Sequence, residues 1–102
     1  MSKPRRLPRI PATLPTILGP ARVELVPNLR DENDARLLGS CNRAERLVKI
    51  ASEPPRVIQW HTYWHEWAHM LLADAGVETP KELVEAICDA VGNARTREML
   101  DA

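Results

Sequence analysis

The most regular alternation of apolar and polar side chains lies between residues 21 and 26. There, Val23 and Leu25 alternate with Arg22 and Glu24. A period of two residues is typical of a strand that buries one face and exposes the other to water. The pattern therefore predicts a strand over residues 21–26, which ends at the proline that follows.

Two shorter strand-like runs come next, over residues 37–41 and 46–51. The polar residues 42–45 between them suit a hairpin turn, and the polar stretch 28–35 is predicted to be a loop. Three strands connected in this order predict a small sheet of three strands, mainly antiparallel.

A stretch without proline or glycine extends from residue 57 to residue 75 and is followed by Gly76. Its length and the glycine at its end predict a long helix with a C-terminal cap. Trp60, Trp64 and Trp67 recur along it at spacings of four and three residues. This spacing predicts an aromatic stripe that packs against the sheet.

A second helix is predicted from about residue 80 to about residue 100. Thr79 can cap it, Pro80 suits its first turn, and Glu82 stands where a capping box needs an acidic side chain. The predicted fold class is therefore α+β. A small antiparallel three-stranded sheet packs on one side of the first helix, and the C-terminal helix packs on its other side.

The composition is that of a soluble globular protein with a single domain. The chain has 102 residues, of which 44% are hydrophobic and 27% are charged. Fourteen basic and fourteen acidic residues cancel, so no overall field attracts nucleic acid or an anionic membrane. The chain shows no signal peptide and no apolar run that could span a bilayer, and Cys41 and Cys88 form no disulfide framework. A cytoplasmic protein is expected.

Residues 1–20 differ from the rest because they are rich in proline and arginine. Prolines at this density disfavour helix, so the pattern predicts an extended arm with little core of its own, followed by a folded domain over residues 21–102. The arm also carries a cluster of positive charge, formed by Lys3, Arg5, Arg6 and Arg9. Nucleic acid or a partner protein could bind there.

The sequence His65-Glu66-Trp67-Ala68-His69 is an HExxH motif inside the first predicted helix. Residues four apart share a helix face, so both imidazoles can reach one metal ion while Glu66 lies beside the water that the ion binds. Zinc in catalytic sites takes three protein ligands and leaves a fourth position to water. The motif therefore predicts zinc-dependent hydrolysis, with His65 and His69 as ligands and Glu66 as general base.

The second predicted helix supplies further acidic groups. Glu85 and Asp89 are four residues apart and share a face, so one carboxylate can bind the ion while the other orients a ligating imidazole. HExxH followed by ExxxD resembles the gluzincin metallopeptidases, and the segment Glu-Ala-Ile-Cys-Asp-Ala-Val-Gly is similar to one in thermolysin-type enzymes. A looser resemblance, over residues 21–92, is to the short phage and prophage metallopeptidases of the ImmA/IrrE and SprT-like groups.

The resemblance implies a minimal zincin-like metallopeptidase domain over residues 21–102, with a zinc ion held by His65, His69 and Glu85. It also implies that Asp89 lies behind a ligating histidine. Glu66 would take a proton from the zinc-bound water and hand it to the leaving amine. A peptide or protein substrate would add as a strand to a sheet edge between Ser40 and Ile50.

Several residues near these motifs have more than one interpretation. His61 and Tyr63 are candidates for the rim of the site or for stabilising the oxyanion, although Tyr63 is expected to turn away from the metal. Cys88 is interpreted as a small buried cysteine rather than as a thiolate ligand. If Glu85 and Asp89 are surface acids, the third ligand is expected among the neighbouring glutamates, Glu82 or Glu78.

Two other functions are compatible with the sequence. The chain has no downstream motif for an oxyanion donor, so a zinc-stabilised protein-binding module with little or no catalytic activity is one alternative. An adaptor that binds nucleic acid or a repressor through the basic arm is another. The sequence identifies neither the substrate nor the oligomeric state.

Overall fold

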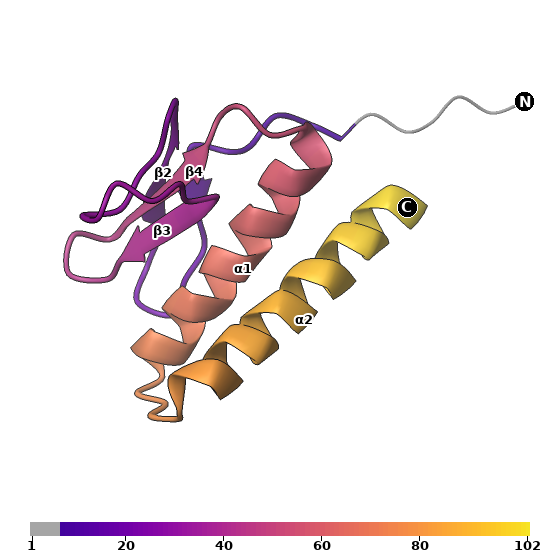
Figure 1. Cartoon of the computed structure of the whole chain (residues 1–102). Coiled ribbons are helices and arrows are strands. Elements are labelled where there is room, and N and C mark those ends of the chain that lie inside the picture. The colour runs from indigo at the N-terminus through magenta and orange to yellow at the C-terminus, as the bar shows by residue number, and fades with distance from the viewer. Residues whose placement is uncertain (1–6) are drawn as a thin grey trace, which may run out of the picture.

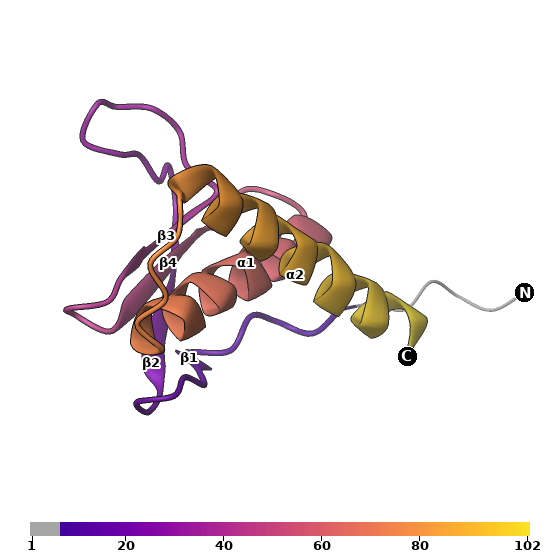
Figure 2. The same cartoon turned by 90° about the horizontal axis from the view of Figure 1, so that it is seen from below.

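The computed structural model describes residues 7–102 and has an α+β fold with one sheet and two long helices (Figure 1). The helix α1 lies between the sheet and the helix α2 (Figures 1 and 2). In chain order the elements are β1 (Thr13–Leu14), β2 (Ala21–Val26), β3 (Gly39–Asn42), β4 (Leu47–Ala51), α1 (Arg56–Asp74) and α2 (Lys81–Asp101).

The sheet has four strands in the order β1-β2-β4-β3. β1 pairs with β2 and β3 pairs with β4 in antiparallel fashion, but β2 and β4 are parallel. The prediction of a three-stranded, mainly antiparallel sheet is therefore wrong in strand number and in one pairing. The physical reason is the apolar character of β4, in which Val48 and Ile50 are fully buried. Such a strand is stable in the middle of a sheet, so it lies between β2 and β3 instead of beyond β3.

The second half of the proline-rich segment is part of the folded core. Leu7 and Leu14 are buried in the same cluster as the sheet and α1, and β1 belongs to this segment. The Trp60 indole on α1 donates a hydrogen bond of 2.7 Å to the Pro8 carbonyl. The expectation that residues 1–20 add little to the core is therefore wrong from residue 7 onwards.

The basic part of the predicted arm begins before the described residues. Lys3, Arg5 and Arg6 lie outside them, so contact of the arm with nucleic acid or a partner stays a prediction. Among residues 7–102, neither helix is long and apolar enough to cross a membrane.

The first predicted helix is confirmed, with α1 shifted by one residue. It ends in two hydrogen bonds, from the Gly76 N–H to the Ala73 carbonyl (3.1 Å) and from the Val77 N–H to the Leu72 carbonyl (3.0 Å). This pair of bonds is a Schellman motif, which needs a residue with positive φ. Gly76 has φ of +72°, so the predicted glycine cap is confirmed.

The predicted capping box of the second helix is not formed. α2 begins at Lys81, and Pro80 is its N-cap residue without any side-chain hydrogen bond. Pro80 has an extended conformation, and its carbonyl accepts hydrogen bonds from the N–H groups of Leu83 and Val84. The helix therefore starts one residue too late for the Thr79 hydroxyl to reach the N–H groups of its first turn.

The aromatic stripe of α1 divides its contacts between the two sides of the helix. Trp60 is buried in the core against the sheet, as predicted. Trp64 faces α2, where its indole N–H lies 3.3 Å from the Met99 sulfur and the Arg95 guanidinium stacks 4.5 Å from its ring. Trp67 also contacts Arg95. The stripe thus joins the sheet, α1 and α2.

Candidate metal centre

Three side chains from the two helices meet in one place. The Nε2 atoms of His65 and His69 are 3.2 Å apart. The Glu85 carboxylate lies 3.2 Å from His65 Nε2 and 2.9 Å from His69 Nε2. These residues form a group that could hold a metal ion.

The donor atoms lie close enough together to share one metal ion. Zinc binds imidazole nitrogen and carboxylate oxygen at about 2.0–2.1 Å, so two ligands of a regular tetrahedron lie about 3.3 Å apart. The two Nε2 atoms are 3.2 Å apart, which is close to this value. The two contacts of Glu85 are made by different carboxylate oxygens, Oε2 to His65 (3.2 Å) and Oε1 to His69 (2.9 Å). Two neutral imidazoles and one carboxylate are also donor types that zinc accepts.

Helix geometry accounts for the convergence. His65 and His69 share one face of α1 because they are four residues apart. α2 must approach that face closely, and Gly92 permits this approach. A Cβ atom on Gly92 would lie 2.9 Å from the His61 carbonyl oxygen and 3.0 Å from His61 Nε2. A larger residue would therefore push α2 and its carboxylates away from the histidines.

Asp89 lies behind one of the histidines. Its Oδ1 atom is 2.8 Å from Nδ1 of His65. A carboxylate at this distance accepts a hydrogen bond from Nδ1–H, which keeps the proton on Nδ1 and leaves the lone pair of Nε2 free to bind a metal. The sequence-based expectation for Glu85 and Asp89 thus agrees with their positions, whereas neither Glu82 nor Glu78 belongs to the group of candidate ligands among the described residues.

Replacing Asp89 with alanine is expected to weaken metal binding without unfolding the protein. Loss of such a partner typically lowers metal affinity by about 10- to 100-fold, because the imidazole loses its orientation and part of its basicity. Zinc titration against a competing chelator measures the change. Asp101→Ala is the matched control on the same helix, and an equal dissociation constant for both variants would contradict the role of Asp89.

The carboxyl group of Glu66 is buried beside the ligand triangle, beneath the edge strand β3. Only 6% of the residue is exposed. Burial raises the pKa of Glu66 to about 7, while His65 and the Cys41 thiol, which lies within hydrogen-bonding distance, lower it. A carboxylate with a pKa near 7 is suited to take up and release a proton at neutral pH.

Gly39 allows β3 to lie directly on α1 at this point. A Cβ atom on Gly39 would collide with the Thr62 methyl group and would lie 3.4 Å from Glu66 Cγ. Neither Gly39 nor Gly92 is among the residues that the sequence predicts for the site. A glycine inside a predicted helix, such as Gly92, is the signal of close packing that could have been used.

His69 lies in surroundings that favour its neutral form. Burial lowers the pKa of His69, although the carboxylate of Glu85 acts in the opposite direction. Neutral imidazole is the form that binds metal. Cys88 is fully buried, and burial raises the pKa of its thiol to about 11. Its position agrees with a small buried cysteine rather than a thiolate ligand.

The two candidates for the oxyanion lie in different environments. Tyr63 is buried, and its hydroxyl donates a hydrogen bond of 3.0 Å to the Thr13 carbonyl on the sheet side of α1. Tyr63 therefore cannot serve at the rim or as an oxyanion donor. His61 is half-buried, and its ring lies 6.3 Å from that of His65, outside the ligand triangle but in the adjoining cleft.

A cleft of about 230 Å³ opens next to Glu66. Its lining comes from the chain before and at the start of β3, from α1 and, through Asp89, from α2. The residues that line it are Arg36, Leu37, Leu38, Gly39, His61, Thr62, His65, Glu66 and Asp89.

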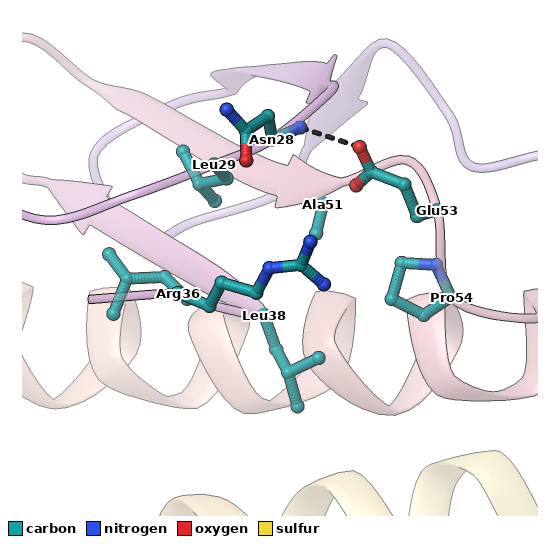
Figure 3. Close-up of a pocket in the computed structure, with 8 residues that line it drawn as sticks. Asn28, Leu29, Arg36, Leu38, Ala51, Glu53 and Pro54 are labelled. Atoms are coloured by element: carbon teal, nitrogen blue, oxygen red, sulfur yellow. Dashed lines mark hydrogen bonds between the residues drawn. The ribbon is translucent and has the colours of Figure 1, made fainter. Parts of the chain in front are cut away.

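A second hollow, of about 120 Å³, adjoins the cleft and shares Arg36, Leu37 and Leu38 with it (Figure 3). Pro54 and Ala51 form much of its apolar lining. The Leu38 side chain is 55% exposed between the two hollows. The two hollows thus adjoin one another beside the candidate metal centre.

No protein-family model matches the chain, and no curated protein or solved structure is significantly similar to it. The geometry of the site is therefore the basis for inferring function. It combines a group of side chains that could hold a metal ion, a buried carboxyl group beside it and a cleft lined by Glu66 and His65.

Proposed function

We propose that the protein is a zinc-dependent metallopeptidase of the gluzincin type that hydrolyses a peptide or protein substrate. The observation that carries this proposal is the triangle formed by His65, His69 and Glu85, with Glu66 buried beside it. A site that only held a structural metal would not need a second acidic group of raised pKa next to the ligands.

Glu66 has the position of the general base. When bound, zinc would supply a Lewis acid that polarises the scissile carbonyl and lowers the pKa of water to about 7. Glu66 takes a proton from the attacking water and returns it to the nitrogen of the leaving amine. Asp89 holds the tautomer of His65 throughout, and the cleft that Glu66 lines gives water and substrate access to its carboxyl group.

The substrate is proposed to bind along β3. This strand is at the edge of the sheet, with β4 on its inner side only. An extended peptide can add to such an edge through backbone hydrogen bonds. The edge borders the cleft next to Glu66, so a bound strand would pass over the catalytic groups.

A protein-binding module with zinc but without activity is the second candidate. It is favoured by the position of Tyr63, which turns away from the site and leaves His61 as the nearest candidate for stabilising an oxyanion. An enzyme lacking an oxyanion donor loses about 10²–10³-fold in rate. Both candidate functions therefore require metal binding, but only the peptidase is expected to cleave peptides.

Removal and return of zinc test the proposal. The purified chain is expected to cleave members of a random peptide library, to lose this activity when a chelator removes the metal, and to regain it when zinc is added. Mass spectrometry of the products measures cleavage. If the zinc-loaded chain cleaves no peptide although it binds one zinc ion, the binding module becomes the better explanation.

A further inference from the structure

The second hollow beside the candidate metal centre carries a cationic side chain that the proposed mechanism does not use. Arg36 lines both this hollow and the cleft next to Glu66. Figure 3 shows the Arg36 side chain directed into the second hollow, towards Glu53 and Pro54. A guanidinium group therefore stands where the two spaces meet.

This guanidinium has no partner within the described part of the fold. Among residues 7–102, the arginine side chains that form ion pairs or hydrogen bonds are Arg30, Arg43, Arg46, Arg56, Arg95 and Arg97. Arg36 is exposed and is not one of them. Its N–H donors are thus available to a ligand.

The acidic groups that border the two hollows are engaged elsewhere. The Glu53 carboxylate accepts a hydrogen bond of 2.6 Å from the Asn28 N–H and attracts Arg36 only from beyond ion-pair distance. The Asp89 carboxylate lies 2.8 Å from His65 Nδ1. Glu66 is buried beneath β3. None of these three carboxylates neutralises Arg36 by direct contact.

The backbone around Arg36 is held in place. Arg36 pairs with Arg30 in an isolated antiparallel β-bridge. The N–H of the next residue, Leu37, donates a hydrogen bond of 3.1 Å to the Leu29 carbonyl. A side chain that starts from a fixed backbone loses less conformational freedom when it binds a ligand, so Arg36 is partly preorganised.

The surroundings of the guanidinium select the chemistry of its ligand. Leu38, Ala51 and Pro54 give the second hollow, of about 120 Å³, an apolar lining beside Arg36. Such a space suits a group with a short apolar stem and one negative charge. A guanidinium binds a carboxylate through two parallel hydrogen bonds, and the single charge of Arg36 matches that of a carboxylate better than the nearly double charge of a phosphate ester.

We propose that Arg36 binds a carboxylate of the substrate and thereby gives the protein a preference for acidic peptides. The apolar stem of the bound group lies against Leu38 and Pro54, and its carboxylate faces the guanidinium. An internal acidic side chain and a C-terminal carboxylate offer this same chemistry. The inference rests on the proposed function for the peptide nature of the ligand, but it does not require cleavage.

Retention of peptides by the zinc-loaded Glu66→Gln chain tests the proposal, because this variant is expected to bind peptides without cleaving them. A random peptide library with acetylated and amidated ends is passed over the immobilised chain, and mass spectrometry identifies the retained peptides. The ratio of Glu to Gln at one position is expected to exceed that of the input library about tenfold. A second library, with free C-terminal carboxylates and no acidic side chains, measures retention through the terminus.

Arg36→Gln in the same chain is expected to abolish the enrichment, and Arg36→Glu is expected to replace it with enrichment of Lys over Gln. Arg22→Gln is the matched control, because it removes an exposed arginine from β2. It should keep the full enrichment. Zinc content and far-ultraviolet circular dichroism show that each variant is folded.

The outcomes separate this inference from the proposed function. Enrichment that depends on Arg36, without cleavage by the unmodified chain, would support the role of Arg36 and count against the peptidase. Cleavage by the unmodified chain, without enrichment of carboxylates in either library, would overturn the role of Arg36 and leave the peptidase standing. An enrichment that persists in Arg36→Gln would also overturn it, and so would failure of the zinc-loaded chain to retain any peptide.

Discussion

Glu66→Gln is expected to lower kcat for peptide cleavage by about 10²–10⁴-fold while zinc remains bound, because glutamine cannot accept the proton from water. The amide has nearly the same size as the carboxyl group that it replaces, so the packing beneath β3 is preserved. Metal analysis and single-turnover cleavage of a library-derived peptide measure the two properties separately.

Glu45→Gln is the control for this variant. It makes the same chemical change at an exposed position in the turn between β3 and β4. Its activity should equal that of the unmodified chain. If Glu66→Gln cleaves peptide as fast as Glu45→Gln does, Glu66 is not the base, and its raised pKa reflects burial without a catalytic role.

The helices and three of the four strands could be predicted from the sequence because their signals are local. β2 has the predicted bounds, and α1 and α2 begin and end within one or two residues of the predicted positions. In each case the pattern of apolar positions and the glycine or proline at an end belong to the element itself. Gly76 is an example, since its positive φ depends only on the helix that it ends.

The order of the strands could not be predicted in the same way. Alternation of apolar residues shows that a segment is a strand, but it does not give the neighbour of that strand or its direction. The two residues of β1 carry no alternation at all, and the prolines around them favoured an arm without a core. Leu14 is buried, and the Thr13 carbonyl accepts a hydrogen bond from Tyr63, which is fifty residues away in the chain.

The candidate site depends both on local sequence spacing, which can be read from the sequence, and on contacts between distant segments, which cannot. His65 and His69 are four residues apart and therefore share a face of α1, and Glu85 and Asp89 share a face of α2 in the same way. The candidate ligands could therefore be named from the sequence. The distance between those faces could not, because it depends on packing at Gly92 and on the connection through residues 75–80. The position of Glu66 under the edge strand likewise depends on Gly39.

His69→Ala is expected to remove zinc from the protein and, with it, the stabilisation that zinc supplies. One of three protein ligands accounts for about 3–4 kcal/mol of binding, or about 10²–10³-fold in affinity. For the unmodified chain, zinc at a hundred times its dissociation constant should raise the free energy of unfolding by about 2.7 kcal/mol. Metal analysis gives the stoichiometry, expected to be one ion per chain, and thermal unfolding with and without zinc gives the stabilisation.

His61→Ala is the control for His69→Ala. It shows whether loss of zinc binding is specific to His69 or follows from removing any histidine on this helix face. His61 lies one turn before His65 and lines the cleft, but its ring is outside the ligand triangle. The variant should bind zinc and be stabilised by it, whereas His69→Ala should show neither property. Equal zinc content in the two variants would mean that the imidazole of His69 is not a ligand, and the close approach of His65, His69 and Glu85 would then be explained by packing of α2 on α1 alone.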